Sequence, residues 1–281
     1  MMTADFLVSD PSSALAPAAS TPALRFTSGG ETLQGILHIP AGPGPHPIVV
    51  VLHGFPGNER NFDLAQALRR AGYAALVFHY RGSWGMGGTW SWGHVLEDAA
   101  QVTAAIRTDE IAGAHRLDPR RLALVGHSLG GFTALMTAAG DPTIGAVASV
   151  SGFNFGAVAP TFTDPAVRRG YVEAFEEELL PLRGTSGEAL VAEMEAAGDA
   201  WSLARLAPRL ADRPVLLVGT SRDTATPHEI HHEPLVKAYE AHPVPRLEHH
   251  VFPSDHALSD HRVALARTVI DFLDRRLAVA E

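Results

Sequence analysis

The stretch from Leu122 to Met136 limits the possible folds of this chain more than any other. An apolar run, Leu122–Val125, leads into the pattern G-x-S-x-G, formed by Gly126, Ser128 and Gly130. Apolar residues then recur at helical spacing, at Phe132, Leu135 and Met136. A sharp turn from strand to helix brings backbone against backbone, so glycine is needed where a Cβ would collide. The stretch therefore predicts a buried strand that turns directly into a helix, with Ser128 at the corner.

A serine at such a corner is a candidate nucleophile. The first amide groups of the following helix, notably that of Leu129, lie beside the hydroxyl and can stabilise a developing oxyanion. Glycine and serine are also common in ordinary turns, which is the alternative interpretation. The apolar run before the motif and the helical pattern after it favour the catalytic one.

Strand and helix patterns alternate along most of the chain. Residues 24–27 and 33–39 predict an antiparallel hairpin, and further strands are expected at 48–52, 74–78, 122–127, 144–150, 214–219 and 247–252. Helical patterns fall between them, at 61–72, 94–107, 229–241 and 262–277. Unbroken β-branched runs such as 48–52 are typical of strands buried on both faces. We therefore expect an α/β fold, with a mostly parallel central sheet and helices on both faces.

The sequence divides the chain into four segments. Residues 1–24 lack Lys, Arg and any long apolar run, which predicts a disordered lead-in and not a signal peptide. Residues 25–152 and 213–281 are the two parts of the expected core. Between them, residues 153–212 show no strand pattern, and helices are expected at 165–180, 187–197 and 200–211. We expect this insertion to lie over the candidate site as a helical cap; the alternative is packing remote from the chemistry.

Three segments at the ends of predicted strands resemble the α/β-hydrolase superfamily. They are the motif around Ser128, the segment 218–227 that contains Asp223, and the segment 253–257 that contains His256. The resemblance extends over residues 25–280 and implies the α/β-hydrolase fold, with a triad in the chain order nucleophile, acid, histidine. In such a triad His256 takes the proton of the Ser128 hydroxyl, and Asp223 orients the imidazole and stabilises its charged form.

The resemblance also implies an oxyanion hole and a substrate pocket. The segment after the strand 48–52 resembles the family's donor loop, so the backbone NH of Phe55 would act together with that of Leu129. The loop 80–92 resembles the Y-R-G-S-x-G-x-G loop of relatives of acylaminoacyl and dipeptidyl peptidases and of some carboxylesterases. Three tryptophans of this loop and one of the insertion are candidates for the pocket wall: Trp84, Trp90, Trp92 and Trp201. Simple packing of the loop explains its tryptophans equally well.

Other residues compete for roles at the site. His261 is the rival to His256, but it stands beside an aspartate at the expected start of the last helix. Arg81 is expected to pair with Glu97 or Asp98, and facing a substrate carboxylate is the alternative. Three histidines at helical spacing suggest a metal site, but neighbouring glutamates make an exposed helix face a sufficient explanation: His228, His231 and His232. We expect no metal and no cofactor.

These features predict a serine hydrolase that works through an acyl-enzyme, most of all a carboxylesterase acting on small or medium acyl esters. A small serine aminopeptidase or acyl-peptide hydrolase is the alternative. It needs a carboxylate for the substrate amine, and the insertion offers Glu173, Glu176, Glu177 and Glu178. The same fold also serves non-catalytic binding proteins, but that class predicts a damaged triad, whereas all three residues are present here. Transfer of the acyl group to an acceptor other than water stays open.

Composition narrows the possible partners. The net charge is −9, from 31 acidic and 22 basic residues, and no basic stripe appears, which argues against nucleic acid. No apolar run reaches the ~20 residues that span a bilayer, so no membrane partner is expected. The absence of cysteine excludes disulfides and thiol chemistry. We expect a cytoplasmic protein with a small-molecule ester or peptide substrate, and we leave its oligomeric state open.

Overall fold

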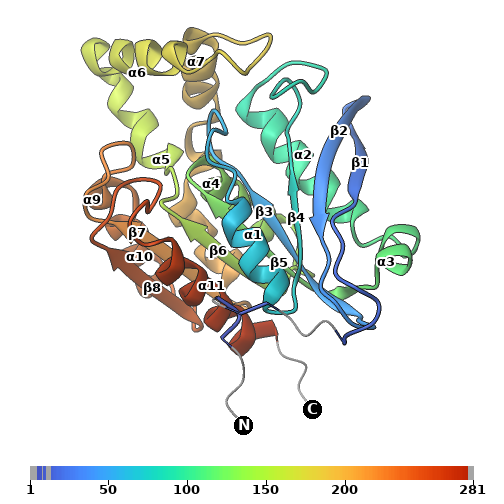
Figure 1. Ribbon diagram of the computed structural model, residues 1–281. Helices are drawn as coiled ribbons and strands as arrows, with labels where there is room; N and C mark the ends of the chain where they lie inside the picture. The colour runs from blue at the N-terminus through green and yellow to red at the C-terminus, as the bar shows by residue number, and fades with distance from the viewer. Residues whose placement is uncertain (1–4, 8, 11–13, 278–281) are drawn as a thin grey trace.

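An eight-stranded sheet runs through the centre of the protein in its computed structural model (Figure 1). The structure describes residues 5–7, 9–10 and 14–277. Along the sheet the strands follow the order β1-β2-β4-β3-β5-β6-β7-β8. Their bounds are β1 (Ala23–Ser28), β2 (Glu31–His38), β3 (His46–Leu52), β4 (Ala74–Phe78), β5 (Leu117–His127), β6 (Ala146–Val150), β7 (Val215–Thr220) and β8 (Leu247–Phe252).

The strand directions confirm the mostly parallel sheet. β1 and β2 form the antiparallel hairpin, and β2 also pairs antiparallel with β4. From β4 to β8 across the sheet, every neighbouring pair is parallel. The carboxyl ends of these strands therefore meet at one edge of the sheet, which is where ligands bind in open α/β sheets.

Helices cover both faces of the sheet, as expected. α1 and α11 pack on one face, and α2, α4 and α10 pack on the other (Figure 1). The bounds of the helices that flank the sheet are α1 (Phe62–Arg70), α2 (Trp92–Ala105), α3 (Asp109–His115), α4 (Leu129–Gly140), α9 (His228–His231), α10 (Glu233–Ala241) and α11 (Arg262–Leu277).

The central strand β3 shows why both faces need cover. Ile48, Val50 and Leu52 belong to the apolar cluster under α2 and α4. Val49 and Val51 belong to the cluster under α1 and α11. Successive side chains of a strand point to opposite faces, so an unbroken apolar run is stable only between two helical layers.

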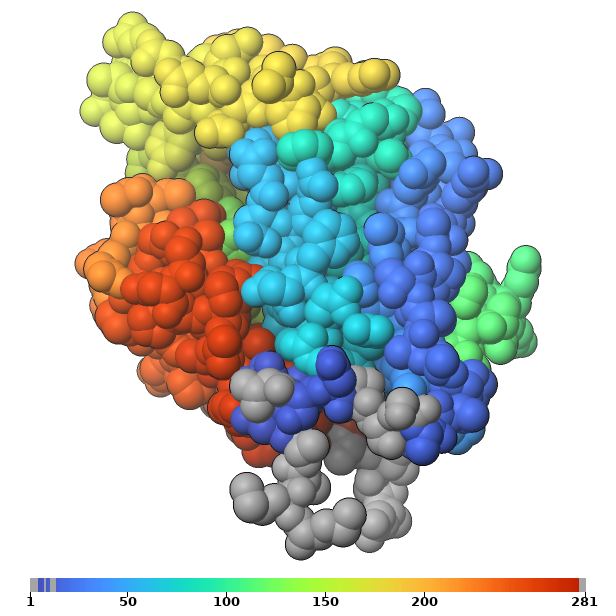
Figure 2. All heavy atoms as spheres, in the orientation of Figure 1, coloured from blue at the N-terminus to red at the C-terminus, as the bar shows by residue number. Residues whose placement is uncertain are grey.

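The segment between β6 and β7 lies above the sheet in Figure 1, and its yellow part covers the upper end of the molecule in Figure 2. Hydrogen bonds tie it to the loop 80–92, because the backbone NH of Trp84 donates to Pro181 and that of Trp90 donates to Arg183. The segment contains α5 (Phe155–Val158), η1 (Ala159–Thr163), α6 (Pro165–Glu177), α7 (Gly187–Ala197), η2 (Gly198–Trp201), η3 (Leu203–Leu206) and α8 (Ala207–Leu210), where η marks a 3₁₀ helix.

Two predicted helices are wrong in part. Residues 200–211 form the 3₁₀ turns η2 and η3 and the short α8, and Pro208 stands in the first turn of α8. The expected helix 229–241 is broken into α9 and α10, because Pro234 stands at the start of α10. A proline has no NH for the helix ladder and clashes with the preceding turn, so it begins a helix and does not continue one.

The described part of the lead-in differs from the disordered segment that we expected. Ser20 pairs with Ile39 beside the hairpin, and Arg70 Nε donates to the carbonyl oxygen of Phe6 at 2.7 Å. Phe6 and Leu7 also pack against the cluster under α1 and α11. Residues 1–4, 8 and 11–13 lie outside the described residues. Within the described residues, every helix is too short or too polar to cross a bilayer.

Candidate active site

Ser128 stands at the corner where β5 turns into α4. Its backbone, with φ 58° and ψ −122°, lies outside the helix and strand regions. The turn is so tight that a Cβ on Gly126 would lie 1.8 Å from the carbonyl oxygen of Gly130, and a Cβ on Gly130 would lie 2.0 Å from that of Leu52. Neither position accepts a side chain. The strained corner places Ser128 on the wall of a pocket at the carboxyl edge of the sheet.

Asp223 follows β7, and each of its carboxylate oxygens is held by hydrogen bonds. Oδ1 accepts from the backbone NH groups of Ala225 at 2.9 Å and Thr226 at 2.8 Å. Oδ2 accepts from the hydroxyls of Thr220 at 2.9 Å and Thr226 at 2.7 Å. Burial alone would raise the pKa of the Asp223 carboxyl, but the hydrogen bond and charge of His256 and the hydrogen bonds of Thr226 outweigh burial and hold the pKa well below its usual value. The carboxylate is therefore ionised at neutral pH.

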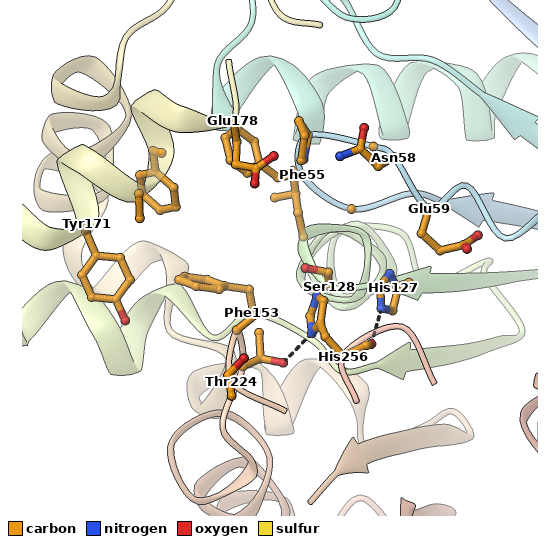
Figure 3. A pocket seen from close by; sticks show the side chains of 18 of the residues that line it. Phe55, Asn58, Glu59, His127, Ser128, Phe153, Tyr171, Glu178, Thr224 and His256 are labelled. Atoms are coloured by element: carbon orange, nitrogen blue, oxygen red, sulfur yellow. Dashed lines mark hydrogen bonds between the residues drawn. The ribbon is translucent and has the colours of Figure 1, made fainter. Parts of the chain in front are cut away.

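His256 lies in the loop between β8 and α11, and its Nδ1 is 2.8 Å from Oδ2 of Asp223. With Nδ1 protonated and engaged in that bond, Nε2 is the nitrogen left to take a proton. The imidazole is 27% exposed, and it lines the same pocket as Ser128 (Figure 3). The Ser128 hydroxyl makes no hydrogen bond with a described residue. Hydrogen bonds between reacting groups are often long without substrate and tighten when it binds.

A second histidine, His127, supports the loop that carries His256. Its Nε2 donates to the carbonyl oxygen of His256 at 2.8 Å, and the two rings pack with centroids 4.8 Å apart. Burial, together with the nearby His256, lowers the pKa of His127 to about 3, so the ring stays neutral. The sequence analysis missed this residue. Its place inside the G-x-S-x-G motif was the available signal, but the motif alone does not say which side of the turn the ring faces.

The pocket in front of Ser128 has a volume of about 670 Å³. The loop 54–59 forms one wall, the segment after β6 forms a second, and α6 forms a third (Figure 3). Three of its rings, Phe55, Trp92 and Phe175, pack against one another with centroids 5.0–5.5 Å apart. The aromatic residues that line it are Phe55, Trp92, Phe153, Phe155, Tyr171 and Phe175. The site can therefore hold an apolar or aromatic group beside the serine.

Backbone NH groups from two segments lie beside Ser128. Leu129 is the first residue of α4, so its NH has no preceding helical carbonyl as a partner. A Cβ on Gly54 would lie 2.9 Å from Cβ of Ser128, which shows how closely the loop that carries Phe55 approaches. Within the described residues the NH of Phe55 donates no hydrogen bond. Phe55 and Leu129 both line the pocket, and neither backbone NH donates a hydrogen bond to a described residue.

Two hydrogen bonds from ring nitrogens hold the loop 54–59 in place. The indole Nε1 of Trp84 donates to the carbonyl oxygen of Pro56 at 2.9 Å. His53 is buried, and its Nδ1 donates to the carbonyl oxygen of Gly54 at 2.8 Å. Burial lowers the pKa of His53 to about 3, so the ring is neutral at neutral pH and keeps the single proton that Nδ1 donates.

The four candidate tryptophans have different places. Trp92 lines the pocket. Trp90 is buried and packs against Trp92, with ring centroids 6.2 Å apart, but it does not line the pocket. Trp201 packs against Phe132 and against the lining residue Phe155, and it does not line the pocket either. Trp84 lines a neighbouring hollow instead. Only Trp92 among the four therefore lies where a substrate in this pocket would touch it.

The rival residues lie elsewhere. His261 Nδ1 is 2.8 Å from Oδ1 of Asp260, in a surface network that does not line the pocket. Arg81 pairs with Asp98, at 2.6 Å between Nε and Oδ1, and with Glu97, so it is structural as expected.

The three histidines at helical spacing have separate surroundings. His228 faces two glutamates, His231 accepts from the backbone NH of Asn154 at 2.9 Å, and His232 packs against His249. Within residues 5–7, 9–10 and 14–277, no group of three His, Asp or Glu side chains is arranged to hold a metal ion.

Comparison with known proteins gives relatives among hydrolases. Over 142 residues the chain is 30% identical to 2,6-dihydropseudooxynicotine hydrolase from Paenarthrobacter nicotinovorans, a match that covers 50% of this chain and 38% of that protein. Over 134 residues it is 37% identical to hydrolase LUC6 from a Fusarium species, covering 44% and 31% of the two chains. The matched region is thus less than half of either relative.

Solved structures share the fold across nearly the whole chain. Est1E from Butyrivibrio proteoclasticus with ferulic acid bound superimposes with a TM-score of 0.68 at 19% identity, over 91% of this chain and 100% of that one. The Pyrococcus furiosus esterase Pf2001 superimposes with a TM-score of 0.68 at 16% identity, over 92% of each chain. A family model described as the alpha/beta hydrolase family matches residues 49–268. The chain therefore belongs to the alpha/beta hydrolase family.

Proposed function

We propose that this protein is a serine hydrolase in which Ser128, His256 and Asp223 form the catalytic triad. The observation that carries the proposal is the 2.8 Å hydrogen bond between Asp223 and His256 at the pocket that Ser128 lines. Three segments far apart in the sequence meet there, each from the carboxyl end of a parallel strand. Acyl transfer needs a nucleophile, a base and an ionised group that orients the base. Ser128, His256 and Asp223 would supply these three groups in that order.

In the proposed mechanism, Nε2 of His256 takes the proton of the Ser128 hydroxyl as its oxygen attacks the carbonyl carbon of the substrate. The backbone NH groups of Phe55 and Leu129 stabilise the oxyanion that forms on the carbonyl oxygen. The alcohol leaves with the proton from His256. Water, activated by the same histidine, then attacks the acyl-enzyme and releases the acid.

Esters with a small or medium acyl group are the proposed substrates. A pocket of about 670 Å³ with six aromatic side chains on its wall suits such a group. The structural relatives Est1E and Pf2001, one of them an esterase by its description and the other with ferulic acid bound, favour ester chemistry for this fold. In this proposal α6 acts as part of a cap, because Tyr171 and Phe175 on it wall the pocket and exclude water from the reaction.

A small aminopeptidase is the second candidate, and one observation favours it. A carboxylate from the insertion, Glu178, lines the same pocket as Ser128. A carboxylate in that place suits the free amine of an aminoacyl substrate. The two candidates differ in the leaving group, which is an alcohol for an esterase and an amine for a peptidase.

The test is hydrolysis of a 4-nitrophenyl ester and of the matching aminoacyl 4-nitroanilide. Ser128→Ala should lower ester turnover at least about 1,000-fold while the fold stays intact by circular dichroism. His256→Ala should act similarly, whereas His261→Ala is the matched control and should leave turnover within about twofold. Retained activity in Ser128→Ala, or a severe loss in His261→Ala alone, would contradict the assigned triad. Efficient anilide cleavage would move the proposal from esterase to peptidase.

A further inference from the structure

The acidic end of α6 places one carboxylate at the pocket. Of the four glutamates there, Glu176 is used inside the insertion, since its Oε2 accepts from the backbone NH of Gly187 at 2.6 Å. Glu173 and Glu177 do not line the pocket in front of Ser128. Glu178 does, and Figure 3 shows it across the pocket from Thr224.

The charged side chains that line the pocket among the described residues are carboxylates, and none is a lysine or arginine. The two carboxylates are those of Glu59 and Glu178. Glu59 already has partners, because its Oε1 accepts from the NH of Asn61 at 2.5 Å and its charge acts on Arg262. The Glu178 side chain makes no hydrogen bond or ion pair with a described residue. Its charge is therefore free to act on a bound molecule.

A second hollow adjoins the first at this carboxylate. Its volume is about 520 Å³, and Pro56, Asn58 and Glu178 line both hollows. Arg183 lines the second hollow but not the first, and it forms no ion pair with Glu178. Glu178 thus stands where a long substrate would leave the aromatic pocket.

The aromatic wall adds to the preference for positive charge. Phe55, Trp92 and Phe175 form one packed group beside Glu178 on the pocket wall. The face of an aromatic ring attracts a cation, most strongly for tryptophan. Rings and a free carboxylate on one wall together suit an ammonium group joined to an apolar body.

We propose that Glu178 is a specificity-determining residue that selects esters whose apolar or aromatic acyl group ends in an ammonium group. This inference rests on the proposed hydrolysis at Ser128. The acyl carbonyl would lie at Ser128, the apolar body would lie among the rings, and the ammonium group would reach Glu178. Anionic acyl groups of the same shape would be rejected by the same charge.

The experiment compares rigid 4-nitrophenyl esters that carry a cationic, a neutral or an anionic group at the far end. The cationic acids are 4-(aminomethyl)benzoic and 4-(aminomethyl)cinnamic acid, which place the ammonium group at two distances from the carbonyl carbon. The 4-ethyl analogues are the neutral partners, and the 4-(carboxymethyl) analogues are the anionic ones. The wild type should prefer the cationic ester of at least one length. Glu178→Gln should lower kcat/KM for that ester by roughly three- to tenfold and leave the neutral ester within about twofold. Added salt should reduce the wild-type preference.

Glu173→Gln is the matched control, because Glu173 lies on α6, which ends at the C-cap residue Glu178, but does not line the pocket. An unchanged preference in Glu178→Gln, or an equal fall in Glu173→Gln, would overturn the inference. Binding of benzylamine, measured by calorimetry, tests the role of Glu178 independently of the proposed hydrolysis. If the wild type cleaves no ester, hydrolysis fails as a function, whereas equal benzylamine binding by wild type and Glu178→Gln refutes the role of Glu178 whatever the turnover.

Discussion

Two glycines in α4 offer a sharp test of how the site is built. Gly130 and Gly140 are the second and the last residue of the same helix. A Cβ on Gly130 would lie 2.0 Å from the carbonyl oxygen of Leu52 and 2.8 Å from that of His53, whereas a Cβ on Gly140 would meet no atom within 4 Å. The change Gly→Ala is chemically identical at both positions, so the tight turn at Ser128 is expected to cause any difference between them.

The expected effects have opposite signs. Ordinary contact begins near 3.4 Å, so the backbone beside Gly130 must move by about 1 Å or more to accept a methyl group. Overpacking against backbone costs about 3 kcal/mol, the upper part of the usual range. The segment that moves leads into Gly54 and Phe55, and a 1 Å misplacement near reacting groups can lower kcat about 100-fold. Alanine at Gly140 should instead stabilise the helix by about 0.5 kcal/mol.

Thermal denaturation and ester hydrolysis measure the two effects together. We expect Gly130→Ala to lower the melting temperature by about 5–10 °C and to lose most of its activity. Gly140→Ala should raise the melting temperature by about 1–2 °C and keep full activity. If Gly130→Ala were as stable and as active as the wild type, the tight approach of α4 to the strand end would not be what shapes the site.

Two further predictions concern buried histidines. Burial lowers the pKa of His53 and His127 to about 3, and that of His231 and His232 to about 4. Below about pH 6.5 these histidines therefore take up protons in the unfolded chain but stay neutral in the folded one. The free energy of unfolding, measured with urea, should therefore fall by about 2 kcal/mol per histidine between pH 7 and pH 5, and a flat profile would contradict this. His127→Leu removes the donor to the His256 carbonyl and should lower kcat about tenfold, whereas His127→Gln, which keeps an NH donor, should recover part of the loss. Equal rates in the two variants would exclude a positioning role for this hydrogen bond.

The fold was predictable from the sequence because its signals are local. The apolar run of β3 requires two covering layers whatever the rest of the chain does. Gly126 and Gly130 mark a turn in which backbone meets backbone within five residues. The alternation of strands and helices leaves few topologies for the parallel sheet. Helix bounds failed where proline decided them, at Pro208 and Pro234.

The walls of the pocket were not predictable in the same way. The sequence pointed to four tryptophans, but only Trp92 lies in the pocket, and the phenylalanines after β6 and on α6 line it instead. Which residues of the insertion line the pocket depends on how its helices pack on the loop 80–92, and those contacts join segments that are far apart in the sequence.

The sequence by itself determined the sheet, the strained corner at Ser128 and the order of the candidate triad, since each depends on contacts between near neighbours or on a fixed strand end. Only the tertiary structure decided which histidine meets Asp223, that His127 holds the His256 loop, and that Glu178 lines the pocket while Glu176 binds the NH of Gly187. Those pairings join residues from separate segments, and the direction of a side chain across such a gap is fixed by packing and not by position in the chain.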